Sequence, residues 1–167
     1  MSAQLKIPVT PADSAEAAVR DSDIIVTATT ATKPVLEGRW LRPGMHVNAI
    51  GVNFPQKREL DAEAIRKCDV IVADSREQSK LESGDLLQMY ADDERRWTTV
   101  LQFKDVVSGA TPGRVNAGQI TLFKSNGIAT EDVAVAGKIY EIAKKRGMGK
   151  EIALWEKTAR AGEARAV

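Results

Sequence analysis

Three groups of residues that could bind a small ligand each follow an apolar run of the sequence. They are TATT at 27–30, GVNFPQK at 51–57 and KSNG at 124–127. Threonine hydroxyls can bond ribose or phosphate oxygens, a lysine attracts phosphate as a point charge, and a glycine lets a flat ring approach the backbone. The same residue types are common in turns and helix caps, so each group taken singly is weak evidence for a site.

Predicted strands and helices alternate along the chain and determine where these groups lie. Continuous β-branched or apolar runs predict strands at 23–29, 45–51, 69–75 and 120–125. Capped or amphipathic runs predict helices at 15–20, 62–68, after Ser75, at 86–97, at 98–114 and at 130–146. This order predicts an α/β fold, a partial Rossmann-like parallel sheet with helices on both faces. Since the carboxyl ends of parallel strands share one edge, the three groups are expected to converge there.

Composition excludes several classes of protein. The 167 residues contain 24 basic and 23 acidic side chains, and a net charge of +1 argues against nucleic acid as a partner. No apolar run approaches the length of a membrane span, and the first residues lack a signal-peptide core, so a cytoplasmic protein without a membrane partner is expected. The lone Cys68 rules out an internal disulfide and provides no metal-ligand spacing, so no metal is expected.

Three longer motifs carry a resemblance to a known family. DIIVTATTATKPVL, GMHVNAIGVNFPQKREL and FKSNGIATEDVAVA resemble, in this order, signatures of the ornithine cyclodeaminase/mu-crystallin family. The resemblance runs from about Ile7 to about Gly149. It implies NAD or NADP as cofactor, a small amino, imino or keto acid as substrate, and a homodimer. It also implies that 1–110 form an incomplete NAD(P)-binding Rossmann-like domain, and that 111–167 are a strand and helices of the substrate and dimerisation domain.

The resemblance assigns roles to individual residues. Asn53 stands at the position of the family's acid/base aspartate and is the catalytic candidate. Phe54 and Asn126 are the substrate-binding candidates. The cofactor-binding candidates are Thr27, Ile50, Gly51, Val52, Asn53, Lys57 and Ser125. Without the resemblance, residues 125–127 remain an ordinary strand-to-helix turn and Asn53 a turn cap.

Two features depart from the family pattern. An amide at position 53 cannot exchange a proton near neutral pH, which disfavours cyclising deamination and leaves an NAD(P)-dependent oxidoreductase or dehydrogenase as the better interpretation. The sequence also contains no G-x-G-x-x-G turn, so this chain is expected to be a truncated, weakly active or inactive form. The alternative is a crystallin-like protein that binds NAD(P) or a small ligand without turnover. Missing strands would also leave the run IIVTAT as an uncovered edge, which predicts either dimerisation or marginal stability.

Three further residues are chemically conspicuous. His46, the only histidine, lies within a predicted strand and is expected to be a packed or edge residue. Cys68 is expected to be a small buried side chain rather than a nucleophile. Arg114 could bind a carboxylate or phosphate, although a solvated turn arginine is the simpler expectation.

Overall fold

A computed structural model describes residues 1–150 and residue 152. The chain divides into two compact units, Met1–Ile128 and Ala129–Val167. The Ala- and charge-rich segment after Lys150, for which the sequence allows a packed helix or a loose tail, lies outside the described residues apart from Ile152. None of the described helices is long and apolar enough to cross a membrane.

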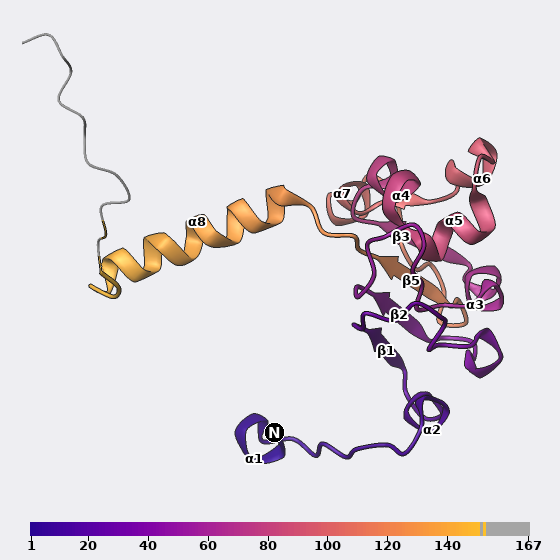
Figure 1. The fold of residues 1–167 in the computed structure, drawn as a ribbon, viewed down its shortest axis with the longest axis horizontal. Coiled ribbons are helices and arrows are strands. Elements are labelled where there is room, and N and C mark those ends of the chain that lie inside the picture. The colour runs from indigo at the N-terminus through magenta and orange to yellow at the C-terminus, as the bar shows by residue number, and fades with distance from the viewer. Residues whose placement is uncertain (151, 153–167) are drawn as a thin grey trace, which may run out of the picture. The chain divides into compact units, whose positions relative to one another are not determined.

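The first unit is built on a five-stranded sheet whose strand pairs are all parallel (Figure 1). Its spatial order is β1-β2-β5-β3-β4. The strands are β1 (Ile24–Thr27), β2 (His46–Ala49), β3 (Val70–Ala73), β4 (Leu101–Gln102) and β5 (Thr121–Lys124). The predicted α/β fold with a parallel sheet is therefore confirmed, and four of the five strands lie within the predicted runs.

One face of this sheet forms the hydrophobic core. Alternate residues of the strands point to this face, among them Val47, Ile71 and Leu122, which are buried. Leu86 and Trp97 from the covering helices pack into the same cluster. The helices on this side are capped by Ser14, Asp61, Ser75 and Ser83, of which the sequence indicates the first three. They and their short neighbours are α2 (Ala15–Val19), the 3₁₀ turn η1 (Gly38–Trp40), α3 (Ala62–Lys67), α4 (Arg76–Glu82), α5 (Gly84–Tyr90) and α6 (Glu94–Trp97).

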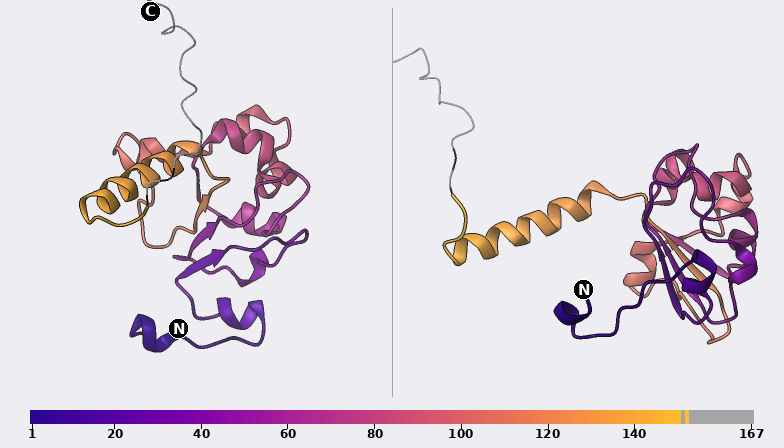
Figure 2. Two further views of the ribbon diagram at one scale, coloured as in Figure 1. Left: turned by 60° about the vertical axis from the view of Figure 1, so that its left-hand side comes forward. Right: turned by 60° about the horizontal axis from the view of Figure 1, so that its bottom comes forward.

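The opposite face of the sheet is covered much less. The short helix α7 (Phe103–Val107) lies on it, with the Phe103 ring 4.9 Å from the Phe123 ring. Figure 2 (right) shows the sheet between α7 on one side and the larger group of helices on the other. On strand β1 the side chains of this face are exposed, Ile24 by 64% and Val26 by 58%. Helices thus lie on both faces. The run IIVTAT, which the sequence predicts to be an uncovered edge, does form an edge strand, but only its alternate residues Ile24 and Val26 are exposed, while Ile25 and Thr27 are buried.

Two predictions about the middle of the chain are wrong in detail. Residues 98–114 are not one helix, because Leu101–Gln102 pair with β3 as a strand before α7 begins. The helix predicted at 86–97 is interrupted at Ala91, whose φ of 35° ends α5. The boundary expected after residue 110 also differs from the structure, in which β5 is the central strand of the sheet and the first unit continues to Ile128.

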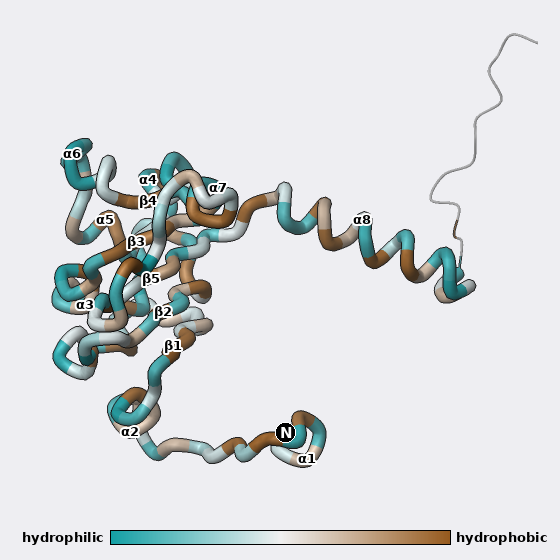
Figure 3. The backbone as a smooth tube through the Cα atoms, turned by 180° about the vertical axis from the view of Figure 1, so that it is seen from behind, coloured by the Kyte–Doolittle hydropathy of each residue, from teal (hydrophilic) through white to brown (hydrophobic). Residues whose placement is uncertain are grey.

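The second unit contains helix α8 (Ala129–Lys145), and a short N-terminal helix, α1 (Ser2–Leu5), opens the first. Glu131 and Asp132 occupy the first turn of α8, Lys144 and Lys145 occupy its last, and none of its residues is buried. Apolar and hydrophilic residues alternate along its length in Figure 3. Such an amphipathic helix with no buried residue is typical of one that packs against another surface.

Truncating Leu122 tests the core. It is fully buried in the central strand, so we expect Leu122→Ala to lower the free energy of unfolding by about 2–5 kcal/mol. Urea unfolding followed by circular dichroism measures this change. The matched control is Leu81→Ala, since Leu81 is 72% exposed and its truncation should change stability by about 0.5 kcal/mol or less. Equal losses in the two variants would contradict the assignment of the core.

Candidate functional site

The three ligand-binding groups predicted from the sequence meet at one edge of the sheet. They follow β1, β2 and β5, which are adjacent parallel strands, and β3 ends beside them. Backbone hydrogen bonds join the ends directly: Ile50 N–H to Thr27 C=O at 2.9 Å, Ser125 N–H to Ala49 C=O at 3.1 Å, and Asp74 N–H to Lys124 C=O at 3.2 Å. The edge is therefore continuous from residue 27 to residue 125, as the strand order requires.

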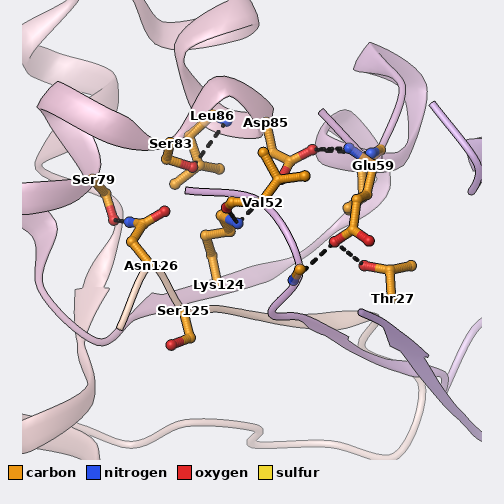
Figure 4. A network of polar contacts seen from close by, with 12 residues as sticks. Thr27, Val52, Glu59, Ser79, Ser83, Asp85, Leu86, Lys124, Ser125 and Asn126 are labelled. Carbon is orange, nitrogen blue, oxygen red and sulfur yellow. Dashed lines mark hydrogen bonds and ion pairs between the residues drawn. The ribbon is translucent and has the colours of Figure 1, made fainter. Parts of the chain in front are cut away.

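A buried glutamate holds the ends of β1 and β2 together. Glu59 is completely buried, and its carboxylate accepts hydrogen bonds from the Thr27 hydroxyl at 2.9 Å, Thr29 N–H at 2.6 Å and Gly51 N–H at 3.1 Å. Figure 4 shows the Glu59 side chain reaching across to Thr27. Three donors satisfy the charged group away from water, so this carboxylate fixes the two loops relative to each other.

A second buried carboxylate and a lysine lie beneath the loop after β2. Asp85, in the first turn of α5, accepts from the backbone N–H of Glu59 at 2.7 Å and of Leu60 at 3.0 Å through Oδ1. Its Oδ2 lies 3.2 Å from Lys124 Nζ. The two atoms form an ion pair, but their geometry is not that of a hydrogen bond. Lys124 also donates to the Val52 carbonyl (Figure 4). Both charged side chains are fully buried.

A third carboxylate shapes the turn after β5. Asp74 Oδ2 accepts from the Ser125 hydroxyl and from the N–H groups of Asn126 and Gly127, all at 2.8 Å. Gly127 has a φ of 84°, in the left-handed region that glycine adopts without strain. The Ser-Asn-Gly turn is thus bound to the end of β3 and not only to its own strand.

The nine predicted site residues fall into three classes of exposure. Ile50, Asn53 and Phe54 are exposed; Gly51, Lys57 and Ser125 are partly buried; Thr27, Val52 and Asn126 are buried. All of them belong to the edge or to the loop that leaves it. Only the first two classes can present a side chain or backbone to a ligand in this structure.

Gly51 and Thr27 are needed for a different reason from the one the sequence suggests. A Cβ on Gly51 would lie 2.2 Å from Thr29 N and 2.5 Å from Glu59 Oε1, so the space beside the glycine is filled by the protein's own chain. The Thr27 hydroxyl is likewise engaged with Glu59. Neither residue leaves room or a free donor for a ring or a phosphate at that point.

Ser125 and Asn126 keep a limited capacity for a ligand. The Ser125 hydroxyl gives its proton to Asp74 and accepts from Gly127 N–H at 3.1 Å, which leaves one lone pair as an acceptor. Asn126 donates through Nδ2 to Ser79 Oγ at 2.8 Å, while its Oδ1 is buried without a hydrogen-bond partner among the residues that the structure describes. Asn126 is 8% exposed, so an interaction with substrate would need this oxygen to become accessible.

Four charged residues of this edge, Glu59, Asp74, Asp85 and Lys124, are missing from the nine predicted site residues, although Lys124 belongs to the KSNG group. The signal for Lys124 is its position two residues after Leu122, which places both on the same buried face of a strand. Asp74 directly follows a buried strand, which is a weaker signal. Glu59 binds Thr27, which is 32 positions away, and Asp85 binds the backbone of Glu59, which is 26 positions away, and no local pattern indicates such partners.

The three other residues singled out in the sequence, His46, Arg114 and Cys68, lie outside the carboxyl edge. His46 Nδ1 lies 2.7 Å from Thr121 Oγ1, and Arg114 donates to the carbonyls of Gly44 and Met45 at 2.7 and 3.0 Å. Both line a groove of about 670 Å³ on the α7 face of the sheet, away from the carboxyl edge. Burial, and secondarily Asp69, raises the pKa of the Cys68 thiol to about 12, which leaves it a poor nucleophile.

Replacing Glu59 by glutamine tests the carboxylate that holds β1 and β2. The substitution replaces one acceptor oxygen by an NH₂ group, which then faces a backbone or hydroxyl donor that it cannot bind. Because this donor is buried and left without an acceptor, we expect Glu59→Gln to lower the free energy of unfolding by about 1–3 kcal/mol. Urea unfolding measures this loss. Glu77→Gln removes the same charge from a side chain that is 68% exposed and should cost less than about 1 kcal/mol. An unchanged stability in Glu59→Gln would show that this carboxylate does not hold the two loops.

Known proteins resemble both the sequence and the fold. Mouse (Mus musculus) ketimine reductase mu-crystallin is 41% identical over 128 residues, which are 77% of this chain and 38% of that protein. The structure of Thermococcus litoralis Delta(1)-pyrroline-2-carboxylate reductase in complex with NADH and L-proline matches with a TM-score of 0.84 and 38% identity, over 90% of this chain and 47% of that one. An archaeal alanine dehydrogenase dimer with bound NAD matches with a TM-score of 0.78 and 32% identity, over 92% and 47%.

The chain therefore spans less than half the length of each of these relatives. A model of the ornithine cyclodeaminase/mu-crystallin family matches residues 1–147, which include every strand and helix described above. With the parallel sheet and the continuous carboxyl edge, this match shows that the chain belongs to the ornithine cyclodeaminase/mu-crystallin family.

Proposed function

We propose that the carboxyl edge of the sheet binds the nicotinamide end of NAD or NADP, and that the chain is part of an oxidoreductase acting on small amino, imino or keto acids. The observation that carries the proposal is the hydrogen bond that joins the last residue of β2 to the turn after β5, from Ser125 N–H to Ala49 C=O at 3.1 Å. The contact brings the exposed residues 50, 53 and 54 to the same edge as the Ser125 hydroxyl. Ligands of open parallel sheets bind at this edge.

The residues present fit the nicotinamide end of the cofactor. Ile50 and Phe54 are about half exposed, at 49% and 50%, and offer apolar surface to a flat ring. The free lone pair of Ser125 suits a donor such as the carboxamide N–H of nicotinamide. When bound, nicotinamide supplies or accepts the hydride. The sequence has no glycine-rich turn for the pyrophosphate, so the fit is limited to one end of the dinucleotide.

Asn53 favours a reductase or dehydrogenase over a cyclodeaminase. Its exposed amide can orient a reacting nitrogen by a hydrogen bond but cannot take up or release a proton near neutral pH. In imine reduction the carbon centre receives a hydride and the nitrogen must carry a proton. A substrate that enters as the protonated iminium brings this proton itself, so residue 53 needs only to orient it. We therefore assign Asn53 an orienting function, with Phe54 beside the substrate and Asn126 behind it.

Turnover by this chain alone is expected to be weak or absent. The contacts described above concern one end of the cofactor, and the chain covers only 38% and 47% of the lengths of the relatives named for these reactions. The alternative is a crystallin-like protein that holds NAD(P) or a small ligand without reacting it. Oxidation of NADH by Delta(1)-pyrroline-2-carboxylate, followed by absorbance, separates turnover from binding alone.

Ligand-observed NMR tests the cofactor site. We expect saturation transfer from the protein to the nicotinamide protons of NADH and much less to its adenine protons, because only the nicotinamide end is held. Reduced nicotinamide mononucleotide should then bind within roughly threefold of NADH, which is less than about 1 kcal/mol. Ile50→Glu should weaken both by about tenfold or more. Saturation of adenine alone, or no transfer to either ring, would overturn the proposal.

The control for this measurement is Val115→Glu. Val115 is 66% exposed and lies in the loop before β5, at the amino edge of the sheet. The same charge introduced there should leave the affinities for NADH and the mononucleotide unchanged. Equal loss in both variants would indicate a general effect of charge rather than a site at residue 50.

We also propose a homodimer, with α8 belonging to the substrate and dimerisation domain and the first unit to the NAD(P)-binding domain. The exposed apolar side chains Ile24 and Val26 on β1 and the exposed apolar residues of α8 support a partner surface. The archaeal alanine dehydrogenase with bound NAD is itself a dimer. A cytoplasmic location stays a prediction.

Sedimentation velocity tests the dimer. We expect the unaltered chain to sediment as a dimer at micromolar concentration and Ile24→Lys to shift it to monomer, because a lysine on an edge strand disfavours association. Leu81→Lys places the same charge on α4, where Leu81 is 72% exposed, and should leave the dimer intact. A monomeric wild-type chain would contradict the proposal.

A further inference from the structure

We propose that the buried Lys124–Asp85 pair is a positioning device for the loop at 50–60, which sets where Asn53 and Phe54 are presented without either charged residue touching a ligand. The inference deepens the proposed function and rests on it for the identity of the ligand. Its structural part, the control of this loop by the pair, is independent of that identity.

Lys124 has surroundings that packing alone does not explain. It is the last residue of the central strand β5, and its side chain is fully buried. Its ammonium group has two contacts, Asp85 Oδ2 at 3.2 Å and the carbonyl of Val52. A buried ion pair is often no more stabilising than an apolar pair of similar volume. The role of the Lys124–Asp85 pair therefore depends on which backbone segments it holds in place.

The pair spans both ends of the loop. Lys124 holds the Val52 carbonyl, immediately before Asn53. Asp85 holds the N–H groups of Glu59 and Leu60, where the loop re-enters the core. One charge contact therefore joins the first and last turns of the segment to the central strand. Figure 4 shows Lys124 between Val52 and Asp85.

Between these ends the loop rests on the residue next to Asp85. A Cβ on Gly84 would lie 1.9 Å from Lys57 O, 2.7 Å from Phe54 O and 2.8 Å from Pro55 O. The loop backbone is thus packed against the start of α5, while residues 53–56 remain exposed on the outside. The underside is made by Gly84, Asp85 and Lys124, and the outer side carries the ligand-facing residues.

Removing both charges together separates positioning from stability. In the double variant Lys124→Met/Asp85→Asn no unpaired charge remains buried, and the side-chain oxygen of the new amide can still accept from the N–H groups of Glu59 and Leu60. We expect the melting temperature of this variant to stay close to that of the wild type. Amide hydrogen exchange within 50–60 should become at least about tenfold faster, with exchange in β2, β3 and β5 unchanged.

The matched control removes a surface pair of the same kind. Lys80 and Glu94 form an ion pair of 2.8 Å in which the Glu94 side chain is 72% exposed. Lys80→Met/Glu94→Gln should leave exchange within 50–60 unchanged. Unchanged exchange in the buried-pair variant would overturn the proposal. Faster exchange over the whole sheet would also overturn it, since the pair would then be only structural. If this double variant does not fold, Lys124→Leu/Asp85→Asn, which also leaves no unpaired charge buried, is measured by the same criteria.

Binding of reduced nicotinamide mononucleotide gives the second readout. We expect the buried-pair variant to bind it several-fold more weakly than the wild type, and the surface-pair variant to bind it equally well. Equal binding by the buried-pair variant would overturn the positioning function even if exchange is faster. If the wild type does not bind the mononucleotide, the proposed function fails, whereas the exchange measurement, made without ligand, still decides whether the pair controls the loop.

Discussion

The structure of the carboxyl edge depends on one requirement. The backbone N–H groups of the loops that follow the strands are buried from water and must each find a hydrogen-bond acceptor. Buried carboxylates from three different segments meet this requirement. Glu59 binds the loops after β1 and β2, Asp85 binds the return of the second loop, and Asp74 binds the Ser-Asn-Gly turn. Since each carboxylate joins segments that are distant in sequence, these loops take their shape from one another and not from their local sequences.

This explains which parts of the fold can be predicted from the sequence. Continuous runs such as IIVT and VIVA are local, and the caps at Asp61 and Ser75 need only a donor three residues away. The central place of β5 between β2 and β3 is not local, because paired residues lie 75 positions apart in β2 and β5 and 51 apart in β3 and β5. The short β4 escapes prediction for the same reason, since its two residues are a strand only beside β3.

The candidate site shows the same division. That the groups around residues 27, 51 and 125 share an edge follows from parallel strands, and the sequence is sufficient for it. That Thr27 and Lys124 point inward follows from a period of two, since each lies two residues after a buried strand residue, Ile25 and Leu122. The partners that receive them, Glu59 and Asp85, cannot be inferred in this way. Their contacts exist only once the loop has closed over α5.

Motif residues of this family therefore belong to two physical groups, and a motif alone does not distinguish them. Gly51 and Val52 directly precede Asn53 in the chain, yet the Gly51 N–H is bound by Glu59 and the Val52 carbonyl by Lys124. Both build the underside of the loop, whereas Asn53 is exposed on its outer side. If the buried pair positions the loop as proposed, a substitution on the underside moves the outer residues without altering their chemistry. Roles carried over from a motif should accordingly be assigned by the side of the loop on which each residue lies.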